Sequence, residues 1–384
     1  MAETAQPIED HEPDHRTAPA TDELRDLGQR LLEATGRLVA IPSVSFNEQA
    51  IADELHEQLS QHRHLHLERI GDNLVASTRL GRRQRVILAG HLDTVPGEAA
   101  VRIENDRVTG LGAADMKGGL AVLAWLAGAV TEPAIDLTFV FYVAEEVAQE
   151  HNGLGELQRR RPELLRADAA ILAEPTGGVL ELGCQGSLQL QVTLVGLRAH
   201  AARSWMGENA IHRLAPLLEV LGAYSPREPV LDGCVFKESL QAVGLEAGVA
   251  ANVVPDSATL RLNHRYAPDR SPSEAFASVQ ALLRPVMRDG DDITILDIAQ
   301  AAPPSLSHPI LAELARVVEA PPRAKLGWTD VARFSAVGVP AVNFGPGQPE
   351  LAHVPGEWVE ADELARTAAS LRRFVLEGDR ALRR

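Results

Sequence analysis

Four short apolar segments of strand length lie in the first half of the chain, and the last three end directly before polar, chemically reactive side chains. Two segments with helical character lie between them, and a further helix is expected to open the fold near Thr21. Strands that alternate with helices favour a mostly parallel sheet, so the pattern predicts an α/β fold in which ligands gather beyond the carboxyl ends of the strands. The predicted strands are 73–77, 85–89, 136–143 and 169–173, and the predicted helices are 118–130 and 153–160.

The spacing of apolar residues changes after Gly186. Residues 188–195 alternate between apolar and polar side chains, as a half-exposed antiparallel strand would. The segments that follow predict a small α+β unit of order β-α-β-β-α-β, and the chain returns to the first pattern after Ala302. We therefore predict one domain from residues 21–185 and 301–384, interrupted by an inserted domain at 186–300. The later predicted strands are 239–244, 259–264, 293–298 and 341–344, and the later helices are 208–224, 273–287 and 361–376.

Composition excludes several classes of protein. The hydrophobic fraction of 45% is normal for a globular chain, and no run of about 18 apolar residues predicts a membrane span. The net charge of −16 would repel phosphate groups, which argues against nucleic acid as a partner. Residues 1–20 have neither a basic start nor an apolar stretch, so we expect a disordered extension and not a secretory signal. With only Cys184 and Cys234 and no export signal, a cytoplasmic location is expected.

Histidine and carboxylate side chains follow three of the predicted strands and recur in two further segments, 110–119 and 349–353. Imidazole and carboxylate groups together suit zinc or another divalent first-row ion. Each motif alone is usually a solvated surface feature, but joint placement at successive strand ends predicts a metal site. The residues concerned are His91, Asp93, Asp115, Glu145, Glu146, Glu174 and His353.

In two of these motifs, neighbouring side chains can take different roles at the site. If the chain is extended at His91 and Asp93, both side chains point the same way, so Asp93 could hydrogen-bond the second ring nitrogen of His91 and fix its tautomer. Glu145 and Glu146 would point in different directions, so that one can bind metal while the other faces a substrate water. A nucleotide loop at 110–112 is disfavoured because the third glycine of the dinucleotide fingerprint is missing.

These segments resemble the aminoacylase and glutamate carboxypeptidase family of dinuclear zinc hydrolases, from about residue 22 to the C-terminus. The most specific parts are 90–96, 110–119, 144–146 and 174–176. The resemblance implies an α/β zinc-peptidase catalytic domain with an inserted lid and dimerisation domain. It also implies two zinc ions per subunit, for which cobalt or manganese could substitute, and a small N-acylated amino-acid substrate.

The family pattern implies a set of metal ligands on the matching positions. His91, Asp115 and Glu174 would bind one zinc ion. Asp115, Glu146 and His353 would bind the other, so that Asp115 bridges the two. A cis peptide bond after Asp115 is implied as well.

Three further residues match family positions around the reaction. Asp93 would orient His91, and Glu145 would be the general base that moves a proton from the attacking water to the leaving amine. His200, which precedes a second matching segment at 207–212, would donate to the oxyanion across a homodimer, from the lid of the other subunit. The resemblance therefore predicts that the active unit is a dimer.

Several stretches resemble one branch of the family, whose members remove a succinyl group from a diamino acid. They are 183–187, 200–212, 325–334 and 343–353. Arg265 and Asn252 match residues that bind a substrate carboxylate, and a guanidinium fork can hold both carboxylate oxygens. Thr329 and Gly345 would line the substrate pocket.

The chain departs from the better known members of this branch at the substrate positions. They carry an arginine pair where this chain has Cys184 and Gln185, and an aromatic residue where it has Arg203. Arg203 is hypothesised to replace one of the lost positive groups. An acetylornithine deacetylase, an aminoacylase or a carboxypeptidase would use the same metal residues and base, so these activities stay open. A catalytically silent metal-binding interaction protein would be expected to lack Glu145 or a ligand, and none is missing.

Overall fold

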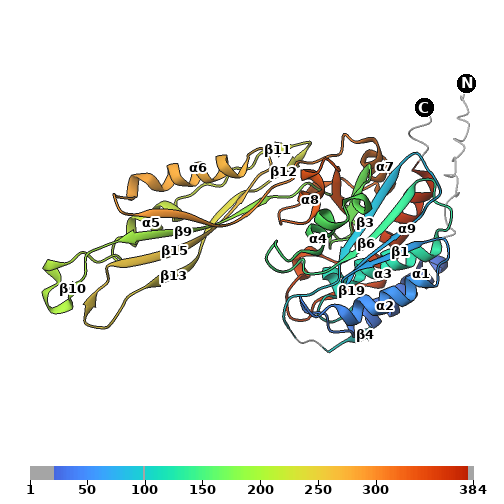
Figure 1. The fold of residues 1–384 in the computed structure, drawn as a ribbon, viewed down its shortest axis with the longest axis horizontal. Coiled ribbons are helices and arrows are strands. Elements are labelled where there is room, and N and C mark those ends of the chain that lie inside the picture. Colours follow the sequence, from blue (N-terminus) through green and yellow to red (C-terminus); the bar gives the residue numbers. More distant parts are fainter. Residues whose placement is uncertain (1–20, 98–99, 379–384) are drawn as a thin grey trace, which may run out of the picture.

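The computed structural model describes residues 21–97 and 100–378. An eight-stranded sheet forms the centre of the larger part of the molecule, and its spatial order is β1-β2-β6-β3-β7-β18-β8-β17 (Figure 1). Its strands are β1 (His66–Ile70), β2 (Asn73–Ser77), β3 (Arg85–His91), β6 (Asp136–Tyr142), β7 (Ala169–Leu172), β8 (Glu181–Leu182), β17 (Arg323–Ala324) and β18 (Ala341–Asn343). The extension predicted at residues 1–20 lies outside the described residues.

The middle of this sheet is parallel, because β3 pairs in parallel with both β6 and β7, and β7 pairs in parallel with β18. Successive side chains of β3 enter two different cores: Val86 and Leu88 pack in one cluster and Ile87 and Ala89 in the other. Both faces of the sheet are therefore covered, which explains why the strands are continuous apolar runs. The predicted mostly parallel α/β fold is confirmed. The covering helices are α1 (Thr21–Val39), α2 (Gln49–Ser60), α3 (Gly118–Ala129), α4 (Gly153–Arg160), α7 (Pro309–Val318), α8 (Val331–Ala336) and α9 (Ala361–Glu377).

A four-stranded antiparallel sheet projects from the larger part as an arm, with spatial order β13-β15-β9-β16 (Figure 1). Two helices cover one face of this sheet, and together they enclose a separate apolar core. The order of main elements along the arm is the predicted β-α-β-β-α-β. The arm contains β9 (Gly186–Val195), α5 (Leu214–Gly222), β13 (Ser239–Ala247), β15 (Ser257–Tyr266), α6 (Pro272–Leu283) and β16 (Asp292–Ala299).

One predicted helix of the arm is too long, since α5 begins at Leu214 and not at Glu208. Glu208 instead exchanges backbone hydrogen bonds with Leu197, and the Ala210 amide donates to the Pro255 carbonyl. Pairing with these other segments thus uses the backbone amide and carbonyl groups that the first helical turn would need.

Several short elements were not predicted. They include α2 and β1, the small sheet of β4 (Arg102–Glu104), β5 (Arg107–Thr109) and β19 (Trp358–Glu360), the pair β10 (Ala199–His200) and β14 (Val253–Val254), and the pair β11 (Val230–Leu231) and β12 (Cys234–Val235). Among the described residues, no helix has both the length and the apolar character needed to cross a membrane.

Candidate active site

Five of the predicted metal-type residues converge next to the ends of β3, β6 and β7. Ligand atoms of His91, Asp115 and Glu174 lie within 4.8 Å of one another, and so do those of Asp115, Glu146 and His353. The two sets share Asp115, as the family pattern implies. A third set within the same limit contains His91, Glu145 and Glu146, so the expected general base stands beside the cluster.

The contacts within the cluster link both imidazole rings to carboxylates. His91 Nε2 lies 3.1 Å from Asp115 Oδ1, and His353 Nε2 lies 2.7 Å from Glu146 Oε1 and 3.4 Å from Asp115 Oδ2. The peptide bond after Asp115 is cis, as expected. Glu174 Oε1 is buried without a hydrogen-bond partner among the described residues. An orphaned carboxylate oxygen beside two further carboxylates and two imidazoles is a donor set that fits divalent cations.

Two carboxylates and one imidazole in this region have pKa values far from their ordinary ones. Burial raises the pKa of Glu174 to about 7, and the nearby charge of Asp115 adds to the shift. Burial also raises the pKa of Glu145 well above its usual range, with Glu174, Asp330 and Glu146 adding and only His91 opposing. Hydrogen bonds to Asp115 and Glu146 raise the pKa of His353 to about 10. Such shifts arise where several acidic groups are held close together, and bound cations would offset the same repulsion.

Asp93 acts on the backbone more than on the ring that it was expected to orient. Its carboxylate accepts hydrogen bonds from Ser45 Oγ at 2.7 Å and from the amides of Glu145 and Glu146, both at 3.0 Å. The nearer partner of His91 Nδ1 is the Asp93 backbone carbonyl at 2.9 Å, while Asp93 Oδ1 lies 3.6 Å away. The His91 ring therefore bonds the backbone carbonyl of Asp93 and not its carboxylate, because the carboxylate already accepts hydrogen bonds from backbone amides. Asp93 therefore holds the backbone of Glu145 and Glu146 with its carboxylate and the ring of His91 with its carbonyl.

Two buried acidic residues at this site were missed by sequence reasoning. Glu357 accepts hydrogen bonds from the amides of Gly112, Ala114 and Asp115 at 3.0, 2.7 and 2.8 Å. Glu48 accepts from the amide of Ala144 at 3.1 Å. Both hold the backbone of a segment that carries metal-type residues. Neither follows a predicted strand, and the only available signal for Glu357 was its position four residues after His353.

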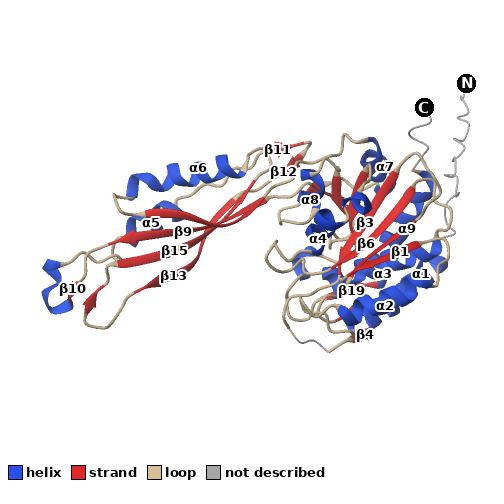
Figure 2. Cartoon of the chain, viewed as in Figure 1, coloured by secondary structure: helices blue, strands red, loops and turns tan. Residues whose placement is uncertain are grey.

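The structure does not bring His200, Asn252 and Arg203 to the metal cluster of the same chain. His200 lies in β10, which pairs with β14, and the Asn252 carbonyl accepts a hydrogen bond from the Ala201 amide. Arg203 lies in the adjoining helical turn, and all three side chains are exposed. Figure 2 shows β10 and this turn at the outer end of the arm. The three residues form one group, but within a single subunit they are remote from Asp115.

Arg265 is separated from Asn252, with which it was expected to bind a carboxylate. Arg265 lies near the end of β15 and Asn252 lies before its start, and a ten-residue strand spans roughly 30 Å. The Arg265 side chain is half-buried, and its Nε donates to Asn263 Oδ1 at 3.1 Å. Among the described residues it has no carboxylate partner. In one subunit, only Arg265 of this pair can lie near the base of the arm.

Thr329 and Gly345 support the segment around Glu174. Thr329 Oγ1 donates to Asn343 Oδ1 at 3.0 Å in β18, the neighbour of β7. A side chain at Gly345 would place its Cβ 2.4 Å from the carbonyl oxygens of both Ala173 and Glu174, so only glycine fits there. Gly345 therefore packs against the backbone of Glu174, and Thr329 and Gly345 are both buried.

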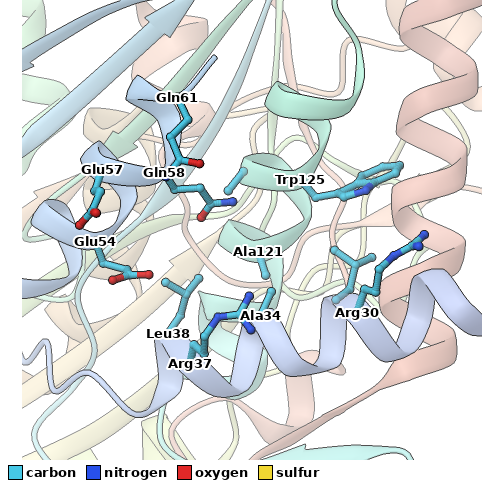
Figure 3. A pocket seen from close by; sticks show the side chains of 12 residues that line it. Arg30, Ala34, Arg37, Leu38, Glu54, Glu57, Gln58, Gln61, Ala121 and Trp125 are labelled. Atoms are coloured by element: carbon cyan, nitrogen blue, oxygen red, sulfur yellow. The ribbon is translucent and has the colours of Figure 1, made fainter.

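A separate groove of about 460 Å³ lies between α1, α2 and α3 (Figure 3). Its walls carry Arg37 and, on the facing helix, Glu54 and Glu57. None of the predicted metal-type residues lines this groove, so it is not part of the candidate site.

Comparison with known proteins identifies the family. The model of peptidase family M20/M25/M40 matches residues 87–377, and the chain therefore belongs to this family. A Corynebacterium glutamicum protein named succinyl-diaminopimelate desuccinylase is 44% identical over 355 residues, which cover 89% of this chain and 95% of that protein. A Mycobacterium tuberculosis protein provisionally named for the same activity is 46% identical over 355 residues, 91% of this chain and 99% of its own length.

Solved structures show the same fold at low sequence identity. A tripeptidase from Staphylococcus aureus superposes with a TM-score of 0.75 at 21% identity, covering 92% of this chain and 99% of the other. A dinuclear metal-binding peptidase of the M20 family from Bacillus subtilis superposes with a TM-score of 0.67 at 15% identity, covering 92% and 99%. With the family established, the expectation of a metal-dependent hydrolase of amide bonds is confirmed.

Proposed function

We propose that this protein hydrolyses the amide bond of N-succinyl-L,L-2,6-diaminopimelate and releases succinate and L,L-diaminopimelate. The observation that carries the proposal is the convergence of two sets of metal-type ligands around Asp115, with Glu145 beside them. Relatives named for this activity at 44–46% identity over most of the chain supply the substrate. The enzyme would act in the cytoplasm, in the supply of a precursor for lysine and peptidoglycan.

The proposed metal ions are two zinc ions, with cobalt or manganese as substitutes. His91, Asp115 and Glu174 would hold one ion, and Asp115, Glu146 and His353 the other. When bound, the pair supplies Lewis acidity to the scissile carbonyl and to the attacking water. Glu145 accepts the proton of that water and passes it to the leaving amine nitrogen as the amide bond breaks. A raised pKa at Glu145 suits this exchange, because the same group must take the proton and then give it up.

A homodimer would complete the site. His200 and Arg203 lie at the exposed end of the arm, where Trp205 and Met206 are also exposed, by 79% and 61%. Large apolar side chains that face solvent together are typical of a surface that another subunit covers. We propose that His200 of one subunit donates to the oxyanion in the other, and that Asn252 and Arg203 reach the substrate in the same way. The net charge of −16 argues against nucleic acid as a partner.

Substrate carboxylates would be bound by arginine. Arg265 is half-buried without a carboxylate partner among the described residues, so it is available to a substrate. Arg203 would replace one of the two positive groups that are lost where this chain has Cys184 and Gln185. Thr329 and Gly345 would shape the pocket beside Glu174.

An acetylornithine deacetylase, an aminoacylase or a carboxypeptidase is the main alternative, because the metal residues and the base would be the same. A substrate panel separates these activities. Zinc-loaded protein is incubated with N-succinyl-L,L-diaminopimelate, N-acetylornithine, other N-acetyl amino acids and a dipeptide, and released succinate, acetate and amine are measured. We expect kcat/KM for the succinylated substrate to be at least about 10²-fold above the others, the scale on which placed polar groups discriminate. Preference for an acetylated or peptidyl substrate would refute the assignment.

A further inference from the structure

Glu48 is a buried acidic residue that the proposed reaction does not use. It lies directly before α2 and is only 4% exposed. Its Oε1 accepts a hydrogen bond from the Ala144 amide at 3.1 Å. Burying a carboxylate has a free-energy cost, which the hydrogen bonds that it accepts must offset.

The amide that Glu48 accepts from belongs to a residue in the left-handed region of the backbone. Ala144 has φ 57°, a value that a residue with a Cβ rarely adopts, and Phe46, two residues before Glu48, has φ 74°. Ala144 is only 2% exposed, so water is excluded from it. Its buried amide donates its hydrogen bond to Glu48. If that acceptor were removed, the amide would be buried without a partner, and the turn would be free to change.

The turn at Ala144 leads directly into the two functional glutamates. The next two amides, of Glu145 and Glu146, both donate to Asp93. Three successive backbone amides are thus held by two carboxylates from separate segments of the chain. This arrangement aims Glu145 at the neighbourhood of His91 while Glu146 contacts His353.

We propose that Glu48 is a positioning residue, which holds the turn at Ala144 so that Glu145 is placed for proton transfer and Glu146 for metal binding. The kinetic part of this inference rests on the proposed function, whereas the metal-binding part does not need a substrate. The role is distinct from that of Asp93, because Glu48 secures the amide that precedes the two glutamates.

The test compares Glu48→Leu and Glu48→Gln with Glu57→Leu, an exposed position on the same helix. Each variant is titrated with zinc and assayed for kcat and KM. We expect Glu48→Leu to lower kcat about 10²-fold, the effect of displacing a catalytic group by about 1 Å, with KM changed less than about 3-fold. One of its two zinc ions should bind at least about 10-fold more weakly. Glu48→Gln keeps one accepting oxygen and should recover most of both properties, and Glu57→Leu should match the wild type.

Wild-type kcat and wild-type zinc affinity in a folded Glu48→Leu protein would overturn the inference. If that variant does not unfold cooperatively, Glu48→Asp decides, because it keeps the charge but withdraws the oxygens by one methylene. We expect lower kcat and weaker zinc binding in Glu48→Asp, and no change in either would also overturn the role. A wild-type protein that hydrolyses no acylated substrate would contradict the proposed function instead, while the zinc titration would still decide the role of Glu48.

Discussion

Asp93 and Glu145 lie in the same region but have different partners, and the difference separates their roles. The Asp93 carboxylate accepts hydrogen bonds from Ser45 and from two backbone amides. Burial alone would raise the pKa of Asp93. The His91 ring and the two amides outweigh burial, so the pKa falls to about 2. Asp93 therefore stays ionised, and its oxygens are occupied by these hydrogen bonds. The Glu145 carboxylate forms no hydrogen bond with another described residue, and its pKa is raised. Of the two, only Glu145 fits the proposed role of exchanging a proton with a substrate water.

Replacing Glu145 should remove catalysis and leave the metal site in place. In Glu145→Ala we expect two bound zinc ions and an unchanged melting temperature, but a kcat lower by at least about 10²–10⁴-fold, the usual contribution of a general base. Zinc content by elemental analysis and turnover at saturating substrate check this. The control is Glu150→Ala, a nearby and exposed residue, which should keep full activity. Activity within a few-fold of wild type in Glu145→Ala would show that another group takes the proton.

Within the arm, a buried ion pair ties the start of α5 to the start of β16. The two terminal guanidinium nitrogens of Arg213 donate to Asp291, at 2.7 and 2.6 Å, and the Asp291 side chain is fully buried. Asp291 also accepts from the amides of Val195 and Arg288. Burial alone would raise the pKa of Asp291, but these hydrogen bonds outweigh it and lower the pKa below its ordinary 3.8.

The lowered pKa gives the pair a defined pH dependence. Ionised Asp291 stabilises the fold at pH values above 3.8, and this stabilisation is lost as the pH falls below that value toward the pKa of the folded state. We expect Asp291→Asn to lower the free energy of unfolding by about 1.5–3 kcal/mol at pH 7, as for hydrogen bonds to a charged group. Urea unfolding at pH 7 and at pH 3 measures the difference, which should shrink at the lower pH. A difference that is equal at both pH values would contradict this account.

At the level of elements, the apolar pattern predicted the central strands and most long helices. Burial on both faces of a strand leaves a continuous apolar run in the sequence, and burial of one face of a helix leaves a helical period. It failed where pairing with a distant segment decides the structure. The strand β1 carries three histidine, glutamate or arginine residues among its five, and it forms only because β2 offers an edge. The same holds for the residues before Leu214, where contacts with Leu197 and Pro255 prevail over helical spacing.

The site was predictable to the extent that its residues follow strands or match family segments. His91 ends β3, Glu145 and Glu146 follow β6, and Glu174 follows β7, so the edge of a parallel sheet was enough to bring these residues together. The supports, Glu48 and Glu357, act on backbone amides, and a sequence gives no sign of which amide is left without a partner. The separation of Arg265 from Asn252 depends on the length of β15, which the sequence pattern underestimated.

For the whole molecule, one subunit holds the metal cluster in the larger part and presents His200 at the outer end of the arm (Figure 1). If the proposed dimer supplies His200 to the other subunit, each active site contains residues of both chains. Proton transfer by Glu145 and hydrogen-bond donation by His200 can then be tested separately, because the two residues can be replaced in different subunits.

Subunit complementation tests the shared site. Glu145→Ala and His200→Ala homodimers should each be nearly inactive, since each site lacks one group. When the two chains are mixed and allowed to exchange, a mixed dimer has one intact site, so about one quarter of wild-type activity should return if subunits pair at random. Mixed dimers that are detected by mass but show no recovered activity would mean that His200 does not act across an interface.

The most direct measurement is anomalous diffraction at the zinc edge from crystals of the zinc-loaded protein. Two peaks are expected, one between His91, Asp115 and Glu174 and one between Asp115, Glu146 and His353, at about 2.0–2.2 Å from the ligand nitrogen and oxygen atoms. Both peaks should be lost in Asp115→Ala, because each ion depends on that carboxylate. Zinc bound elsewhere, or no zinc between these residues in the fully loaded protein, would contradict the proposal that they form a dinuclear site.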